Sequence, residues 1–184
     1  RIDRMNAMFG PQMMPLDMEI KAGELIDNEL TVSIETRHGS LVDAEVHLKD
    51  SLSLTFTGDI SPYEPWALDW TQGNLTLGDR TKAYGSFDGH YLKILAKVNA
   101  IENAYHITAD SLQVTLAINK KGIDFTNGVI YTPNETFDFD GDVKWNDEHP
   151  HTSWNVRQQH GGSASAYVHI GDSIALDVQA DKVV

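Results

Sequence analysis

The sequence predicts an all-β protein, because apolar and polar residues alternate in steps of two along most of the chain and turn-forming residues recur between the alternating runs. The clearest runs cover residues 30–34, 42–48, 52–56, 112–118, 137–139, 143–145, 164–170 and 174–178. Successive side chains of a strand point to opposite faces of its sheet, so each run has one apolar and one polar face. We therefore expect about a dozen amphipathic strands.

The N-terminal stretch has a different pattern. Ile2, Met5 and Phe9 have the spacing of one helix face, and Gly10 followed by Pro11 is a helix stop. The pattern predicts a short helix over residues 1–9 and a link that ends at residue 15, with strands over residues 16–184. The only composition break, at residues 61–66, gives no convincing domain boundary, so we expect residues 1–184 to form a single domain. Since the chain opens on Arg1, we expect it to be a segment of a longer protein.

Clusters of Gly, Asn and Asp predict the turns, because these residues tolerate the left-handed backbone of tight hairpins. The predicted turns include residues 26–28, 37–40, 58–59, 88–89, 127–128 and 161–162. Pro62 and Pro65 lie close together, and a proline cannot donate to a sheet ladder. Residues 61–66 are therefore predicted to form a crossover or lid rather than a strand.

The composition restricts the partners. The net charge of -13 argues against nucleic acid and against an anionic membrane surface, both of which are bound by clustered Lys and Arg. The chain has no cysteine, which excludes disulfides and thiolate chemistry. No apolar run reaches the roughly 20 residues of a membrane helix.

Few residues suggest chemistry. Asp138, Asp140 and Asp142 invite a calcium interpretation, but their alternation with apolar residues favours a solvated strand face. His149 and His151, with His160 as a third ligand, have zinc-like spacing, yet Pro150 favours a polar turn. The glycine- and serine-rich segment 161–165 does not match a nucleophile elbow. The sequence thus predicts a protein that is not an enzyme and that needs no cofactor.

Four tryptophans offer a second kind of site. Trp145 and Trp154 are in phase with neighbouring apolar residues and are predicted to lie inside the fold. Trp66 and Trp70 lie beside the prolines and are free in this interpretation to stack on a sugar ring. The alternative prediction is thus a β-sandwich or jelly roll that acts as a carbohydrate-binding or adhesive module of a larger surface protein.

The C-terminal third resembles a family. A glycine-marked strand over residues 139–145 is followed by a compact strand at 152–156, a small-residue strand at 161–166 and an amphipathic strand at 174–178. This order is similar to that of the AsmA-like, TamB-type proteins of the bacterial cell envelope. The resemblance implies a curved, taco-like or half-pipe sheet with an apolar concave face. It also implies a periplasmic location, with the parent protein anchored in the inner membrane.

The function that follows is lipid binding and transfer, or assistance to outer-membrane assembly, by an apolar groove. The partners implied are phospholipid acyl chains, unfolded β-strands or an outer-membrane assembly protein, and nucleic acid is not among them. The residues predicted to line the groove are Leu52, Leu54, Phe56, Leu112, Val114, Leu116, Ile118, Phe137, Phe139, Val143 and Trp145.

Overall fold

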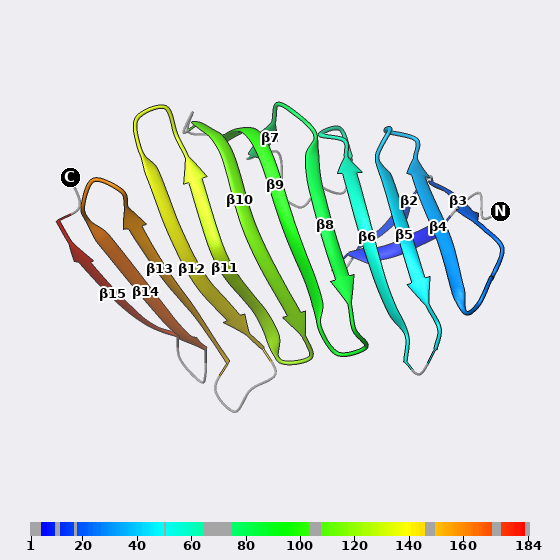
Figure 1. The fold of residues 1–184 in the computed structure, drawn as a ribbon. Coiled ribbons are helices and arrows are strands. Elements are labelled where there is room, and N and C mark those ends of the chain that lie inside the picture. The colour runs from blue at the N-terminus through cyan, green and yellow to red at the C-terminus, as the bar shows by residue number, and fades with distance from the viewer. Residues whose placement is uncertain are drawn as a thin grey trace.

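A computed structural model describes residues 5–9, 12–16, 18–49, 51–64, 75–103, 108–145, 150–170 and 174–182. This part of the chain consists of strands and connections (Figure 1). The strands are β1 (Met5–Phe9), β2 (Gln12–Leu16), β3 (Met18–Ala22), β4 (Glu29–Thr36), β5 (Leu41–His47), β6 (Ser53–Ile60), β7 (Leu75–Leu77), β8 (Thr81–Phe87), β9 (Leu92–Asn103), β10 (Thr108–Asn119), β11 (Gly122–Tyr131), β12 (Thr136–Lys144), β13 (His151–Gln158), β14 (Ser163–Ile170) and β15 (Ile174–Asp181).

One large antiparallel sheet dominates the fold. Its 13 strands run in the order β15-β14-β13-β12-β11-β10-β9-β8-β6-β5-β4-β3, with β7 paired beside β9. Chain neighbours are thus sheet neighbours except at β7, which pairs with β9 while β6 pairs with β8. The curved sheet is open, with β3 and β15 at its two edges (Figure 1). The prediction of an all-β protein with about a dozen strands is confirmed. The alternative of a β-sandwich or jelly roll is wrong for the described residues, because 13 strands belong to one unclosed sheet and the second sheet consists of β1 and β2 alone.

The N-terminal helix is a wrong prediction. Met5–Phe9 is a strand, and it pairs antiparallel with Gln12–Leu16 from Met5 opposite Leu16 to Phe9 opposite Gln12. The predicted link up to residue 15 is therefore largely the second strand of a hairpin, and residues 1–4 lie outside the described part. The described residues include no helix that is both long and apolar enough to cross a membrane.

Two of the predicted turns lie inside strands. Gly58 and Asp59 belong to β6, where Gly58 pairs with Val42 and with Ala83. Asn127 forms a bulge in β11, with a positive φ of 50° and a register shift between Phe125 and Gly128. Turns do form at residues 37–39 and 27–28, where Asp27 and Asn28 take positive φ values of 49° and 67°.

The described part of the sheet has almost no enclosed core. Val114, with 7% of its surface exposed, is the only hydrophobic residue there that is classed as buried. A packed sandwich would bury the apolar residues of both sheets against each other. Apolar residues such as Val42, Phe56 and Leu116 are instead half-buried.

Candidate functional site: an apolar face from edge to edge

A single row of apolar residues crosses the sheet from edge to edge. In this central row, each residue lies directly opposite the next one on the neighbouring strand. The central row consists of Ala22, Val32, Ala44, Phe56, Gly85, Ile94, Leu116, Phe125, Gly141, Trp154, Ala166 and Val178. Residues that are directly opposite each other in antiparallel strands share a face. The central row is therefore one continuous apolar strip.

Two flanking rows widen this strip into an apolar face. One row runs from Leu30 on β4 to Leu176 on β15, and the other begins at Ile20 on β3. The first flanking row consists of Leu30, Val46, Leu54, Phe87, Leu92, Ile118, Ile123, Val143, Thr152, Val168 and Leu176. The second consists of Ile20, Ile34, Val42, Gly58, Ala83, Ala96 and Val114, and continues in phase to Gly128 and Phe139. Asp, Glu, Lys and Arg do not occur in these three rows.

The opposite face is polar and charged. One row on this face consists of Glu45, Thr55, Ser86 and Lys93, each directly opposite the next. Along each strand, its members alternate with those of the central and first flanking rows. The two faces also differ in exposure, since Val42 and Ala44 are half-buried whereas Asp43 and Glu45 are exposed. Burial therefore alternates along β5 in step with the two faces.

Aromatic rings on the apolar face occupy the space beside cross-strand glycines. Gly128 is opposite Phe139, and a Cβ atom placed on Gly128 would come within 2.6 Å of Phe139 Cδ1 and closer still to Cζ. The same relationship joins Gly141 to Trp154, where a Cβ atom would lie 2.6 Å from Trp154 Cε3. Aromatic rings that cover cross-strand glycines are a known way to stabilise curved sheets.

The rings form a cluster at the centre of β11, β12 and β13. The centroid of Trp154 lies 4.8 Å from that of Phe125 and 6.4 Å from that of Phe139. These separations are typical of favourable aromatic contacts. The cluster makes a broad, low apolar floor rather than a deep pocket.

The predicted groove residues mostly meet on this face. Register places Leu54, Phe56, Leu112, Val114, Leu116, Ile118, Phe137, Phe139 and Val143 on it together. Leu52 and Trp145 lie outside the strands and are exposed, so the interior position predicted for Trp145 is wrong. Trp154, also predicted to lie inside the fold, is half-buried on the apolar face. Trp66 and Trp70 lie outside the described residues.

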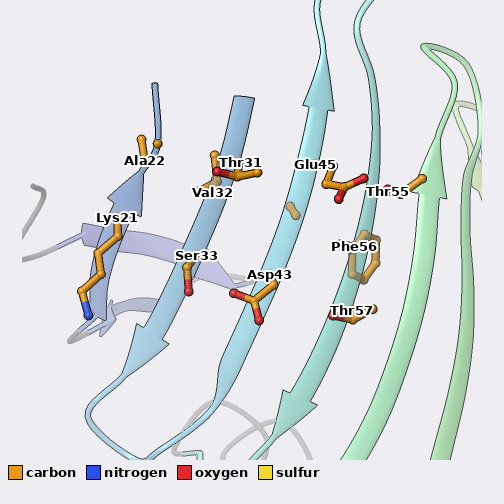
Figure 2. A pocket seen from close by; sticks show the side chains of 12 residues that line it. Lys21, Ala22, Thr31, Val32, Ser33, Asp43, Glu45, Thr55, Phe56 and Thr57 are labelled. Atoms are coloured by element: carbon orange, nitrogen blue, oxygen red, sulfur yellow. The ribbon is translucent and has the colours of Figure 1, made fainter. Parts of the chain in front are cut away.

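A hollow with a volume of about 660 Å³ extends over β3, β4, β5 and β6 (Figure 2). Its lining includes Lys21, Asp43 and Glu45, residues with hydroxyl groups (Thr31, Ser33, Thr55 and Thr57) and four residues of the central row (Ala22, Val32, Ala44 and Phe56). The charged and hydroxyl groups of this lining do not suit an acyl chain, because unpaired polar groups are costly to desolvate.

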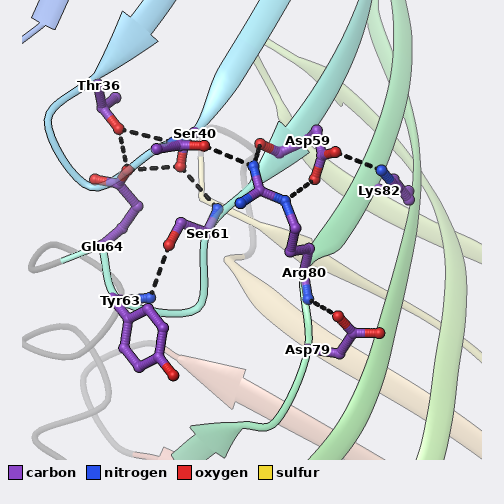
Figure 3. A network of polar contacts seen from close by, with 10 residues as sticks. Thr36, Ser40, Asp59, Ser61, Tyr63, Glu64, Asp79, Arg80 and Lys82 are labelled. Carbon is purple, nitrogen blue, oxygen red and sulfur yellow. Dashed lines mark hydrogen bonds and ion pairs between the residues drawn. The ribbon is translucent and has the colours of Figure 1, made fainter.

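A buried glutamate ties the turn after β4 to the segment after β6 (Figure 3). Glu64 has 2% of its surface exposed, and its Oε1 accepts hydrogen bonds from the hydroxyls of Thr36 and, at 2.5 Å, Ser40. The Ser61 amide donates in turn to Ser40 Oγ at 2.8 Å. Residues 61–64 therefore form an anchored connection, in agreement with the prediction of a non-strand segment.

Asp59 holds two cations at the same end of the sheet (Figure 3). Arg80 Nε lies 2.5 Å from Asp59 Oδ1, and Lys82 Nζ lies 2.5 Å from Oδ2. Arg80 Nη2 also donates to the Gly39 carbonyl at 2.6 Å. The hydrogen bonds from Lys82 and then Arg80 lower the pKa of the Asp59 carboxyl.

The residues weighed as metal ligands are held by hydrogen bonds within the sheet. Asp142 Oδ1 accepts from Ser153 Oγ at 2.8 Å, and Asp140 Oδ2 accepts from Asn155 Nδ2 at 3.0 Å. His160 Nδ1 lies 3.0 Å from Glu135 Oε1. His160 follows the end of β13, whereas His151 begins that strand. Within the ranges that the structure describes, no three His, Asp or Glu side chains gather in a metal-binding arrangement, and His149 lies outside these ranges.

Sequence reasoning missed the rows and the Glu64 anchor. The rows depend on the register of every strand pair, whereas alternation within a strand gives its two faces but not its partners. Glu64 is a lone acidic residue between two prolines, so its burial has no signal in the sequence. Comparisons with protein-family models, with curated proteins and with solved structures give no match to this chain.

Proposed function

We propose that the apolar face binds the acyl chains of lipids, as a non-enzymatic module for lipid binding or transfer. The observation that carries this proposal is the central row, which is apolar in every strand from β3 to β15 that it crosses. Ordinary monomers leave apolar patches of only a few hundred Å² exposed, and larger ones mark binding sites, so an apolar row that crosses the sheet from edge to edge supports this proposal.

The lipid-binding surface in this proposal is the concave side of the curved sheet. The half-buried state of Val42 and Ala44, beside exposed Asp43 and Glu45, supports this assignment, since side chains crowd together on an inner surface. Burial of each methylene on such a surface contributes about 0.8 kcal/mol. Several methylenes would hold a chain without a specific pocket, and the charged opposite face would keep the complex in water.

Acyl chains fit this surface better than sugars do. Sugar binding needs polar groups beside an aromatic platform, whereas Phe125, Phe139 and Trp154 are surrounded by aliphatic side chains and glycines. A role in the periplasm, with a parent protein anchored in the inner membrane, is the setting that the AsmA-like resemblance implies for this proposal.

Two adjacent small residues provide a matched test. Ala166 lies in the central row between Trp154 and Val178, while the neighbouring Ser165 points to the polar face between Asn155 and Gln179. Both positions are half-buried. A glutamate at either one adds the same charge to the same strand, but only Ala166→Glu places it on the apolar face.

The experiment is a fluorescent fatty-acid titration of the wild type and both variants, with native mass spectrometry to detect co-purified phospholipid. We expect saturable binding by the wild type and by Ser165→Glu, and at least a tenfold loss with Ala166→Glu. Circular dichroism and urea unfolding check that each variant is folded. A folded wild type that binds no probe and carries no lipid would show that the proposal is wrong.

A further inference from the structure

The hollow over β3, β4, β5 and β6 lies on the polar face of the sheet. On each strand its lining consists of the central-row residue and residues directly beside it in the chain (Figure 2). The two flanking apolar rows of these four strands contribute no residue to the lining. They share the apolar face with the central row, so a hollow on that face would touch them. The hollow therefore lies above the backbone of the central row, between polar side chains.

Two sets of polar residues cross this hollow side by side. In each set, an acidic residue of β5 lies directly between two hydroxyl-bearing residues, one on β4 and one on β6. Directly opposite Cβ atoms of a strand pair are about 4.5–5.5 Å apart, so the three side chains of a set can contact one small group. The first set consists of Thr31, Glu45 and Thr55, and the second consists of Ser33, Asp43 and Thr57.

The side chains of both sets are open to a ligand. Among the residues that the structure describes, none of these six side chains has a hydrogen-bond or ion-pair partner. Lys21 is the only cation of the lining, and its Nζ lies 3.9 Å from carboxylate oxygens of Glu19 and Glu35. The carboxylates of Asp43 and Glu45 therefore leave the hollow with uncompensated negative charge. Charge complementarity calls for a cation.

The two sets have the spacing of a molecule with two ammonium groups. Residues i and i+2 of a strand are about 7 Å apart, which is about the span of an extended diamine with four or five methylene groups. An ammonium group has three N–H donors and no acceptor, and each set offers one carboxylate and two hydroxyl oxygens as acceptors. Ala44 lies between the sets with its side chain on the apolar face, so methylene groups can cross above its backbone.

We infer that this hollow binds a linear aliphatic diamine, the unit from which polyamines are built, with one ammonium group at each set. Charge-assisted hydrogen bonds from the ammonium groups to Asp43 and Glu45 supply most of the affinity. The hydroxyl groups and the distance between the sets supply the selectivity. The inference concerns the polar face and does not depend on lipid binding by the apolar face.

The probe is 1,5-diaminopentane, titrated into the ¹⁵N-labelled chain at pH 7 and constant ionic strength while the amide chemical shifts are followed. We expect saturable shifts centred on residues 31–33, 43–45 and 55–57. 1-Aminopentane has the same carbon chain with one ammonium group, and it should bind at least tenfold more weakly. Among diamines of increasing length, affinity should be highest at four or five methylene groups. Equal affinity of the monoamine and the diamine, or affinity that does not depend on length, would overturn the inference.

Matched variants separate this site from the overall negative charge of the chain. Asp43→Asn with Glu45→Gln should lower the affinity for 1,5-diaminopentane at least tenfold. Asp138→Asn with Asp140→Asn removes the same charge at the same spacing from β12, where Arg157 lies directly opposite Asp138. This control should bind like the wild type. An equal loss in both double variants would show that binding follows net charge, and it would overturn the inference.

A third double variant tests the hydroxyl groups alone. Thr55→Val with Thr57→Val keeps both carboxylates and keeps β-branched side chains, which suit a strand. We expect at least threefold weaker binding, because each ammonium group loses one acceptor. Circular dichroism checks the fold of all three double variants. Unchanged affinity of the folded threonine variant would show that the sets do not act as units, and it would also overturn the inference.

Discussion

The ring of Phe139 occupies the space above Gly128, its directly opposite partner on β11. All three of the nearest atoms that a Cβ on Gly128 would meet belong to this ring. The glycine is therefore required by the ring and not by a turn. A side chain at position 128 would therefore compete with the Phe139 ring for the same space.

Gly128→Ala should destabilise the protein. The added methyl group forces Phe139 out of its place, and overpacking of this kind costs about 1–3 kcal/mol. Urea unfolding measures the loss. Gly58→Ala is the matched control, because Gly58 also lies on the apolar face but its Cβ would meet Ala83 Cβ and Ile60 Cδ1 at an ordinary 3.5 Å. The double variant Gly128→Ala with Phe139→Leu should lose less than the sum of the single changes, and strict additivity would contradict this competition for space.

Alternation predicted most of the strands, because a period of two is fixed by the geometry of the strand itself. The runs at residues 42–48 and 112–118 became β5 and β10 for this reason. The N-terminal prediction failed because the spacing of only three residues, Ile2, Met5 and Phe9, is too little to distinguish a helix from a strand. The central row could not be predicted from the sequence, because it depends on the register of every pair of neighbouring strands.

Local sequence was also misleading at Asn127 and Gly128. An Asn-Gly pair is a strong hairpin signal, yet here β11 continues through it because Phe125 and Ile130 both pair with β12 on either side. The length of a strand was thus decided by its partner. The Asn-Gly pair forms a bulge in β11 instead of a hairpin turn. Bulges of this kind bend a strand and change the direction of its side chains.

Glu64→Ala should lower the free energy of unfolding by about 1–3 kcal/mol, because the buried hydroxyls of Thr36 and Ser40 lose their acceptor. Glu64→Gln keeps an acceptor oxygen at Oε1 and should cost less. Urea unfolding of the two variants measures the difference. Tyr63→Ala alters the preceding, exposed side chain and serves as the control. Equal stability of Glu64→Ala and the wild type would contradict an anchoring role.

Acid should weaken the Asp59 cluster. The pKa of Asp59 is lower in the folded chain than its ordinary value because Lys82 and Arg80 bond the carboxylate. A lowered folded pKa contributes stability above the unfolded pKa of about 4, and this contribution is lost as the pH falls through the folded pKa. Asp59→Asn should therefore be less stable than the wild type at pH 7, and the two should converge below about pH 4.

Urea unfolding between pH 3 and pH 7 checks this convergence. Asp138→Asn, which removes a carboxylate from the same polar face, is the control and should follow the wild type more closely. A constant difference between Asp59→Asn and the wild type over the whole pH range would show that the carboxylate's charge is not what stabilises the cluster.

The bulge at Asn127 makes a final prediction about the curved sheet. Its φ of 50° lies in the left-handed region, which asparagine tolerates and β-branched residues do not. Asn127→Val should destabilise the protein by about 1–2 kcal/mol, and Asn127→Gly should be neutral or slightly stabilising. Thr126→Val, one residue earlier in extended backbone, is the matched control and should have little effect. If Asn127→Val proves as stable as the wild type, the bulge is not fixed by residue 127, and the register on either side of it must be set by the pairing of β11 with β12 alone.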